Sequence, residues 1–198
     1  MSLGRHLSAL ALSLAVAGCG RAEPQHGPLA LAQVSPRQSA RLHVASDAVG
    51  PDGAIGRRWS AYGDNLSPPL MWTPVAGAAT YAVIVEDPDA PGDAPFVHWL
   101  IWNIPGGQAA LPAGIAGGGR PPVPAGAAQG RNGAGQIGYF GPRPPPGTGV
   151  HHYHLEVFAL DARLAPPTGA RVGALIAAMR SHVLADGELI GAFSAPAP

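Results

Sequence analysis

The sequence predicts a mostly β fold, either a β-sandwich or an α+β domain dominated by antiparallel sheet, with one helix near the C-terminus. Three runs rich in β-branched and aromatic residues, at 80–86, 97–104 and 153–160, are typical of strands. The 198 residues include 28 Gly and 23 Pro, which favours turns and irregular loops over a helical bundle. With 46% apolar and 12% charged residues, the chain is too apolar to be disordered and suits one domain.

The third of these runs alternates most regularly, and polar residues lie at its start. His151 and Tyr153 fall on the face that continues into apolar residues, whereas Glu156 falls on the opposite face. We therefore expect His151 and Tyr153 to point toward a buried or pocket side at the open end of the strand. Residues 41–45 and 189–194 are weaker strand candidates.

One amphipathic helix is predicted for residues 169–184. Thr168 is positioned to cap its start, and Gly187 follows its end. Its apolar side chains recur with helical spacing on a single face: Val172, Leu175, Ile176, Met179 and Val183.

The N-terminus has the pattern of an export signal. Arg5 provides a basic start, and residues 7–17 form an apolar stretch that is long enough for a signal core but too short to cross a bilayer. Val16-Ala17-Gly18 precedes the only cysteine, Cys19, as in a lipoprotein signal, so we expect Cys19 to be acylated. The alternative is an ordinary signal with an incidental cysteine.

These features predict three segments. Residues 1–18 are a lipoprotein signal peptide, residues 19–38 carry the lipidated cysteine and a flexible tether, and residues 39–196 form the domain. We expect an exported protein that its lipid anchor holds at the membrane, on the periplasmic side of the bacterial cell envelope.

Composition and motifs argue against several classes of function. The formal net charge is zero and no basic stripe is present, so nucleic acid is not an expected partner. One cysteine cannot form an internal disulfide or a zinc site of several thiolates, and His152 and His154 do not complete a zinc-binding spacing. Neither a P-loop nor a Gly-x-Ser-x-Gly elbow occurs, and we expect no cofactor, no metal and no enzymatic activity.

Three segments hold the candidate functional residues. Asp87 directly follows a strand in the sequence Asp-Pro-Asp-Ala-Pro, where two prolines stiffen the backbone; the alternative is a turn with solvated aspartates. His98 lies within an apolar strand; the alternative is a core histidine that bonds a backbone carbonyl. Residues 141–150 form a rigid Pro/Gly loop that leads into His151 and Tyr153.

Together these segments resemble the phosphatidylethanolamine-binding protein family, also called Raf kinase inhibitor-like proteins, of the YbhB/YbcL type in bacteria. The matching motifs are Asp-Pro-Asp-Ala-Pro at 87–91, a His followed by hydrophobic residues and Asn at 98–103, and the loop and strand at 141–153. Residues 62–72 are similar to a further family segment. The resemblance covers about residues 41–194, with the motifs in the family's order.

The resemblance implies an antiparallel β-sandwich with a small anion pocket at one end. Matched by motif, the pocket residues are Asp87, His98, His151 and Tyr153, with the backbone of Gly141 and Pro142. Imidazole, phenol and backbone amide groups donate to phosphate or carboxylate oxygens. Because a carboxylate repels an anion, we expect Asp87 to orient a histidine and to raise its pKa, so that the ring is cationic.

The implied function is non-catalytic binding of an anionic small molecule or phospholipid headgroup. Two alternatives are inhibition of a protease or other enzyme through protein–protein contact, and acid–base catalysis by the His, Asp and Tyr cluster. Pro146 replaces a Lys that is frequent in eukaryotic relatives, and Phe96-Val97 lacks the usual Trp, so the ligand's identity is not carried over. An exported protein would not meet a cytosolic kinase, so kinase inhibition is not expected.

Overall fold

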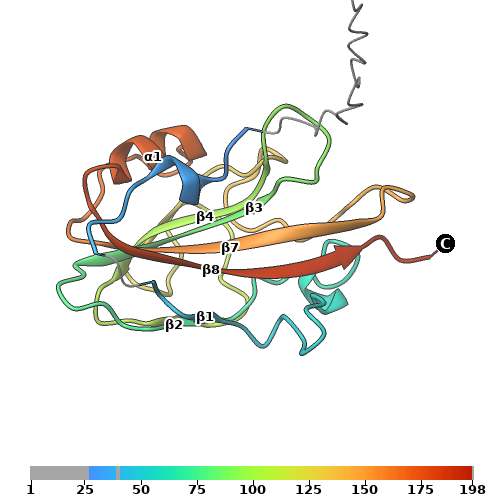
Figure 1. The fold of residues 1–198 in the computed structure, drawn as a ribbon, viewed down its shortest axis with the longest axis horizontal. Coiled ribbons are helices and arrows are strands. Elements are labelled where there is room, and N and C mark those ends of the chain that lie inside the picture. Colours follow the sequence, from blue (N-terminus) through green and yellow to red (C-terminus); the bar gives the residue numbers. More distant parts are fainter. Residues whose placement is uncertain (1–26, 39–40, 198) are drawn as a thin grey trace, which may run out of the picture.

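A five-stranded antiparallel sheet, in the order β6-β4-β3-β7-β8, forms the centre of the fold. The computed structural model describes residues 27–38 and 41–197. The strands of the large sheet are β3 (Thr80–Asp87), β4 (Phe96–Pro105), β6 (Ala128–Gln129), β7 (Val150–Leu160) and β8 (Val183–Ser194). A second sheet lies beneath it (Figure 1) and contains β1 (Val44–Ala45), β2 (Leu70–Trp72) and β5 (Ala110–Leu111). The predicted antiparallel sandwich with a late helix is confirmed.

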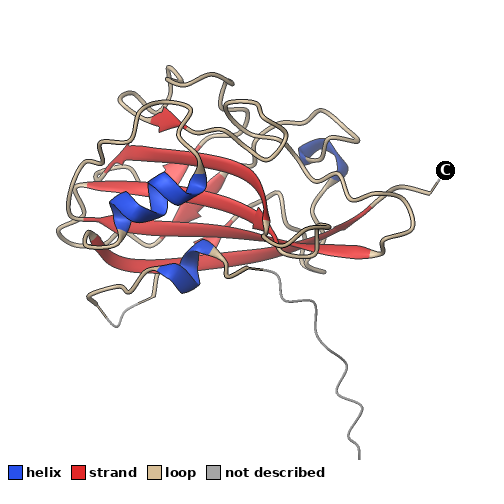
Figure 2. Cartoon of the chain, turned by 90° about the horizontal axis from the view of Figure 1, so that it is seen from above, coloured by secondary structure: helices blue, strands red, loops and turns tan. Residues whose placement is uncertain are grey.

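The large sheet is buried on both faces, as the unbroken apolar runs of its central strands require. All eight residues of β3 are buried. Because side chains alternate along a strand, Val83 packs into the core between the two sheets, while Ile84 packs into a second core on the other face. The helix α1 (Val172–Met179) and the short helix η1 (Ala30–Gln33) cover that second core (Figure 2).

The predicted helix is wrong at both ends. It begins at Val172, and Arg171 precedes it without a side-chain capping bond, so Thr168 is not its cap. Val183 begins β8, and Gly187 lies inside that strand, where an added Cβ would meet the carbonyl oxygen of Leu42 at 2.1 Å. The helical spacing of a few apolar residues does not reveal where a short helix ends and the next strand begins, because both elements bury apolar side chains in the same core.

The N-terminal part of the described chain packs on the domain instead of leading away from it. Residues 27–38 lay within the predicted flexible tether, yet the backbone amides of Ala30 and Leu31 donate to the carboxyl groups of Glu86 (2.8 Å) and Glu156 (3.2 Å). The tether prediction is therefore too long at its C-terminal end, and the Glu156 face of β7 is not the solvent side. The predicted signal peptide and Cys19 lie outside the described residues.

Candidate functional site

The ends of three neighbouring strands meet at one edge of the large sheet and border a cavity. In the antiparallel register Asp87, the last residue of β3, pairs with Phe96, the first residue of β4, and Glu86 pairs with His154 near the start of β7. The cavity has a volume of about 330 Å³. Its lining residues come from these strand ends and from the proline loop: Asp87, Ala90, Pro91, Phe96, His98, Ala134, Phe140, Arg143, Pro144, Pro145 and His151.

Asp87 and His151 form a buried pair at the base of the cavity, 3% and 2% exposed. The Nδ1 atom of His151 lies 2.8 Å from Oδ2 of Asp87, and its Nε2 atom lies 2.9 Å from Oγ1 of Thr148. The other carboxyl oxygen of Asp87 accepts the backbone N–H of Asp89 at 2.8 Å. Because both carboxyl oxygens are engaged, Asp87 holds the imidazole in one orientation. Asp87 is therefore not a solvated turn residue.

His98 lines the cavity, as expected of a pocket residue, and it is also a buried histidine that bonds a backbone carbonyl, which was the alternative interpretation. Its Nδ1 atom lies 2.5 Å from the carbonyl oxygen of Phe140, and since a carbonyl only accepts, Nδ1 carries the proton. Burial is the main cause that lowers the pKa of His98 to about 4, so the ring is neutral near pH 7. The lone pair on Nε2 then accepts hydrogen bonds. Of the two imidazoles, His98 is therefore not the cationic ring expected from the sequence.

The remaining sequence-predicted site residues do not line this cavity. The amide of Gly141 already donates to Oδ1 of Asn65 at 2.7 Å, so it is not available to an anion. Pro142 and Tyr153 line a separate small void of about 10 Å³ behind the cavity. Tyr153 supports His98 with its ring, at a centroid distance of 5.1 Å, and its buried hydroxyl lies beside the Asp87 carboxyl group. Burial, and then the nearby Asp87 carboxylate, raise the pKa of Tyr153 well above its usual range.

Two kinds of lining residue escaped the sequence analysis. Phe96 and Phe140 flank His98, with ring centroids at 4.8 and 6.0 Å. Arg143 is the one arginine among the described residues that lines the cavity, and it is exposed. A charge inside the proline-rich loop was a signal that could have identified Arg143, because such a loop holds its backbone rigidly beside His151.

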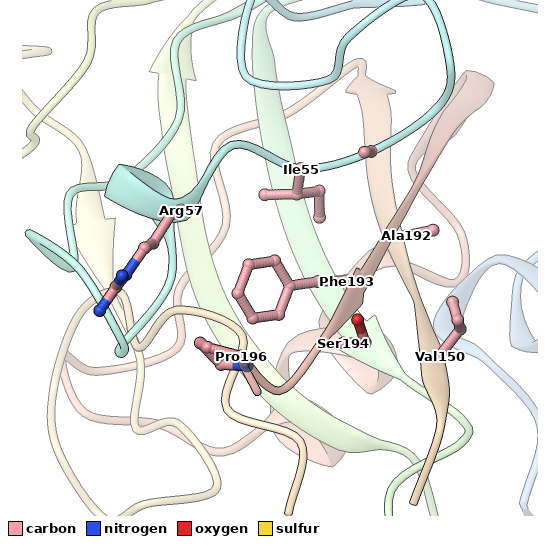
Figure 3. A pocket seen from close by; sticks show the side chains of 8 residues that line it. Ile55, Arg57, Val150, Ala192, Phe193, Ser194 and Pro196 are labelled. Atoms are coloured by element: carbon pink, nitrogen blue, oxygen red, sulfur yellow. The ribbon is translucent and has the colours of Figure 1, made fainter. Parts of the chain in front are cut away.

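A wider groove of about 410 Å³ lies at the same end of β7 and β8 but has a different chemistry (Figure 3). Its lining is mostly apolar, with Phe193 and Ile55 at its centre and Arg57 at one side. None of the sequence-predicted site residues lines it. The ring of Tyr62 stacks on Phe193, and its hydroxyl donates to the carbonyl oxygen of Pro144, so Tyr62 connects the groove to the proline loop.

Within the described residues, no helix is long and apolar enough to cross a membrane. In the same part of the chain, no group of three or more His, Cys, Asp or Glu side chains is arranged to hold a metal ion.

Comparison with known proteins identifies the class of fold and site. A model of the family described as "Phosphatidylethanolamine-binding protein" matches residues 45–194. Two solved structures agree in fold and share more than a quarter of their sequence with this chain. One is YbcL of Escherichia coli, with a TM-score of 0.72 and 30% identity over 79% of this chain and 100% of that chain. The other is a phosphatidylethanolamine-binding protein homologue of Chlamydia trachomatis, with a TM-score of 0.69 and 31% identity over 80% of this chain and 100% of that chain.

The chain belongs to the phosphatidylethanolamine-binding protein family, in its bacterial branch, and is a ligand-binding protein of that kind. Curated relatives extend the comparison. A UPF0098 protein of Methanothermobacter thermautotrophicus is 39% identical over 153 residues, which are 77% of this chain and 98% of the relative. A protein of Mycobacterium tuberculosis named "Putative lipoprotein LppC" is 35% identical over 93% of this chain and 92% of its own length.

Proposed function

We propose that this protein binds a small phosphate-bearing ligand, without transforming it, in the cavity between Asp87, His98 and His151. The observation that carries the proposal is the buried Asp87–His151 pair in a cavity that Arg143 also lines. A guanidinium group pairs with phosphate oxygens through several N–H donors. The His151 ring, held by Asp87 through Nδ1, adds a directed polar contact through Nε2 when a ligand oxygen replaces the exposed Thr148 hydroxyl that now lies 2.9 Å from Nε2.

The protonation pattern of the cavity favours a singly charged ligand that keeps one hydroxyl proton. The cavity contains the Asp87 carboxylate, which repels a dianion. Because Nδ1 of the neutral His98 ring donates to Phe140, Nε2 keeps a lone pair that can accept a proton from a ligand hydroxyl. A phosphate monoester near pH 6 meets both conditions, because its second pKa is about 6 and its monoanion retains one O–H.

A titration of the purified domain with methyl phosphate, followed by NMR of the histidine rings, tests the proposal. We expect shifts at His98 and His151, and a loss of affinity of about tenfold or more in His151→Ala. Arg143→Gln should weaken binding about threefold to tenfold, whereas Arg180→Gln, an exposed arginine at the end of α1, should not. Unshifted histidine rings at saturating methyl phosphate would refute the proposal.

The hydroxyl requirement has a test of its own. Dimethyl phosphate carries one negative charge but has no proton to donate to His98. At pH 6 it should bind at least about threefold more weakly than methyl phosphate, because the hydrogen bond to Nε2 is lost. Equal affinities would show that His98 does not accept a ligand proton.

One observation favours a second candidate function, hydrolysis. Thr148 Oγ1, His151 and Asp87 form a hydroxyl–imidazole–carboxylate relay with distances of 2.9 and 2.8 Å, the arrangement that activates a nucleophilic hydroxyl. The Thr148 hydroxyl also lies 2.8 Å from the carbonyl oxygen of Pro145, which competes for its proton. Turnover of p-nitrophenyl acetate that disappears in Thr148→Val would support hydrolysis over simple binding.

We further propose that Cys19 is lipidated and that the protein is held on the periplasmic side of the cell envelope. The likeness to LppC, which extends over most of both chains, supports this proposal. The amide of Gly27 donates to the carbonyl of Asp93 (2.8 Å), in the β3–β4 loop beside the cavity. Gly27 is the eighth residue after Cys19, and eight residues span about 29 Å at most, so the cavity would lie within reach of lipid headgroups.

A further inference from the structure

A second hollow adjoins the main cavity and has a distinct lining. It measures about 220 Å³ and shares Pro91 and Phe96 with the main cavity. Among the residues that the structure describes, its charged lining residues are Arg131 and Arg171, and none of the lining residues is Asp or Glu. Neither arginine forms an ion pair with any residue that the structure describes. Two guanidinium groups therefore line one hollow, and no described residue neutralises either of them.

The backbone around the two arginines is held firmly by hydrogen bonds. The amide of Arg131 donates to the carbonyl of Ala170, next to Arg171, at 3.0 Å. The amide of Gly133 donates to Val97 at 2.7 Å, which ties the same segment to β4. The guanidinium of Arg131 donates to the carbonyl of Gly135, and this contact uses one of its five N–H donors. Both side chains thus extend from an ordered backbone with donors to spare.

The partition between the two hollows is the ring of Phe96. An added Cβ on Gly133 would meet this ring at 2.6 Å, which shows how closely the arginine-bearing segment packs against it. The same ring lies 4.8 Å from that of His98, measured between centroids. Because Phe96 and Pro91 line both hollows, a ligand seated beside His98 has the hollow with the two arginines as its neighbour.

We infer that Arg131 and Arg171 form a second anion subsite, so that the protein's preferred ligands carry two anionic groups, one beside His151 and one beside these arginines. This inference rests on the proposed function, because the first group occupies the main cavity. It adds a ligand class, molecules with two phosphate groups or with a phosphate and a carboxylate joined by a short linker. Guanidinium groups match both kinds of group.

The test compares monophosphates with bisphosphates in the full mature domain. The probes are methyl phosphate and a series of α,ω-alkanediol bisphosphates with two to six methylene groups, measured by calorimetry. Two identical ends alone give a statistical advantage of twofold. We expect at least one bisphosphate to bind about tenfold more tightly than methyl phosphate, since two exposed charge contacts each contribute several-fold.

The variants separate this subsite from the main cavity. The double variant Arg131→Gln/Arg171→Gln should return the bisphosphate advantage to about twofold while methyl phosphate binds as before. Arg180→Gln, which removes the same charge at the other end of α1, should keep the full advantage. Thermal unfolding of each variant checks that the fold is retained.

Each other outcome has a clear meaning. If methyl phosphate binds but no bisphosphate exceeds the twofold factor, the second subsite does not exist and the proposed function stands. An advantage that survives in the double variant, or that falls equally in Arg180→Gln, also overturns the inference. If neither class of ligand binds the unmodified protein, the proposed function itself fails.

Discussion

Replacing Glu156 by Gln should change how the stability of the protein depends on pH. Glu156 is fully buried in β7, and within the described residues only one of its carboxyl oxygens has a hydrogen-bond partner, the amide of Leu31. Burial, and then the charge of nearby Glu86, raise the pKa of Glu156 from its ordinary value of 4.5 to about 9. The folded protein therefore keeps this carboxyl protonated at pH values where the unfolded chain releases the proton.

The sign and size of the effect follow from proton linkage. A carboxyl whose pKa is raised by folding stabilises the protein fully below pH 4.5, and this contribution is lost as the pH rises toward 9. The loss is about 1.4 kcal/mol per pH unit, or about 4 to 5 kcal/mol by pH 8. Glutamine has no such dependence, but its amide leaves a buried donor group without a partner, which costs about 1–3 kcal/mol at every pH.

The two stability profiles should therefore cross between about pH 5 and 7. Below the crossing the unmodified protein is more stable, and above it Glu156→Gln is more stable. Urea unfolding at intervals from pH 5 to 8.5 measures both curves, and Asp47→Asn, at an exposed position, serves as the control that should follow the unmodified protein. Parallel curves for the unmodified protein and Glu156→Gln would show that Glu156 is ionised in the folded state, contrary to this reasoning.

Four further outcomes are expected. Asp87→Asn should weaken methyl phosphate binding about tenfold, because it releases His151, while the exposed Asp93→Asn should have no effect; equal effects would remove the orienting role of Asp87. Gly133→Ala should displace the ring of Phe96, lower the melting temperature by several degrees and reduce ligand affinity, as scanning calorimetry and titration would show. Affinity for inorganic phosphate should rise severalfold from pH 8 to pH 6 as the monoanion forms, whereas an unchanged affinity would contradict the preference for a protonated ligand. Cys19→Ser should move the protein from the membrane fraction to the soluble fraction of cells, and a protein that stays with the membrane would exclude anchoring through this residue.

Local sequence predicted the strands and the site segments well, because their signals are local. The run at 80–86 became β3 with one residue added, and the motif at 87–91 follows it directly. Alternation along β7 correctly placed His151 and Tyr153 on the buried face, where they are 2% and 1% exposed. Such patterns depend on which neighbours share a face, and a single strand contains that information.

Contacts between distant segments decided what the local patterns could not. Glu156 lies on the face of β7 opposite His151 and Tyr153, and alternation along the strand does not reveal whether that face meets solvent. It is buried because η1, more than a hundred residues earlier in the chain, covers it. Gly141 has an amide suited to an anion, but Asn65 accepts that hydrogen bond. In both cases the deciding partner lies far away in the sequence.

The sequence by itself determined the family, the antiparallel architecture and three of the residues that line the cavity, Asp87, His98 and His151, because periodicity and short motifs are properties of the chain. The tertiary structure alone decided which histidine Asp87 holds and which is neutral. Protonation depends on burial and on nearby charges, and these exist only once β3, β4 and β7 lie side by side. The same assembly put Arg143 at the main cavity, and Arg131 and Arg171 at the adjoining hollow.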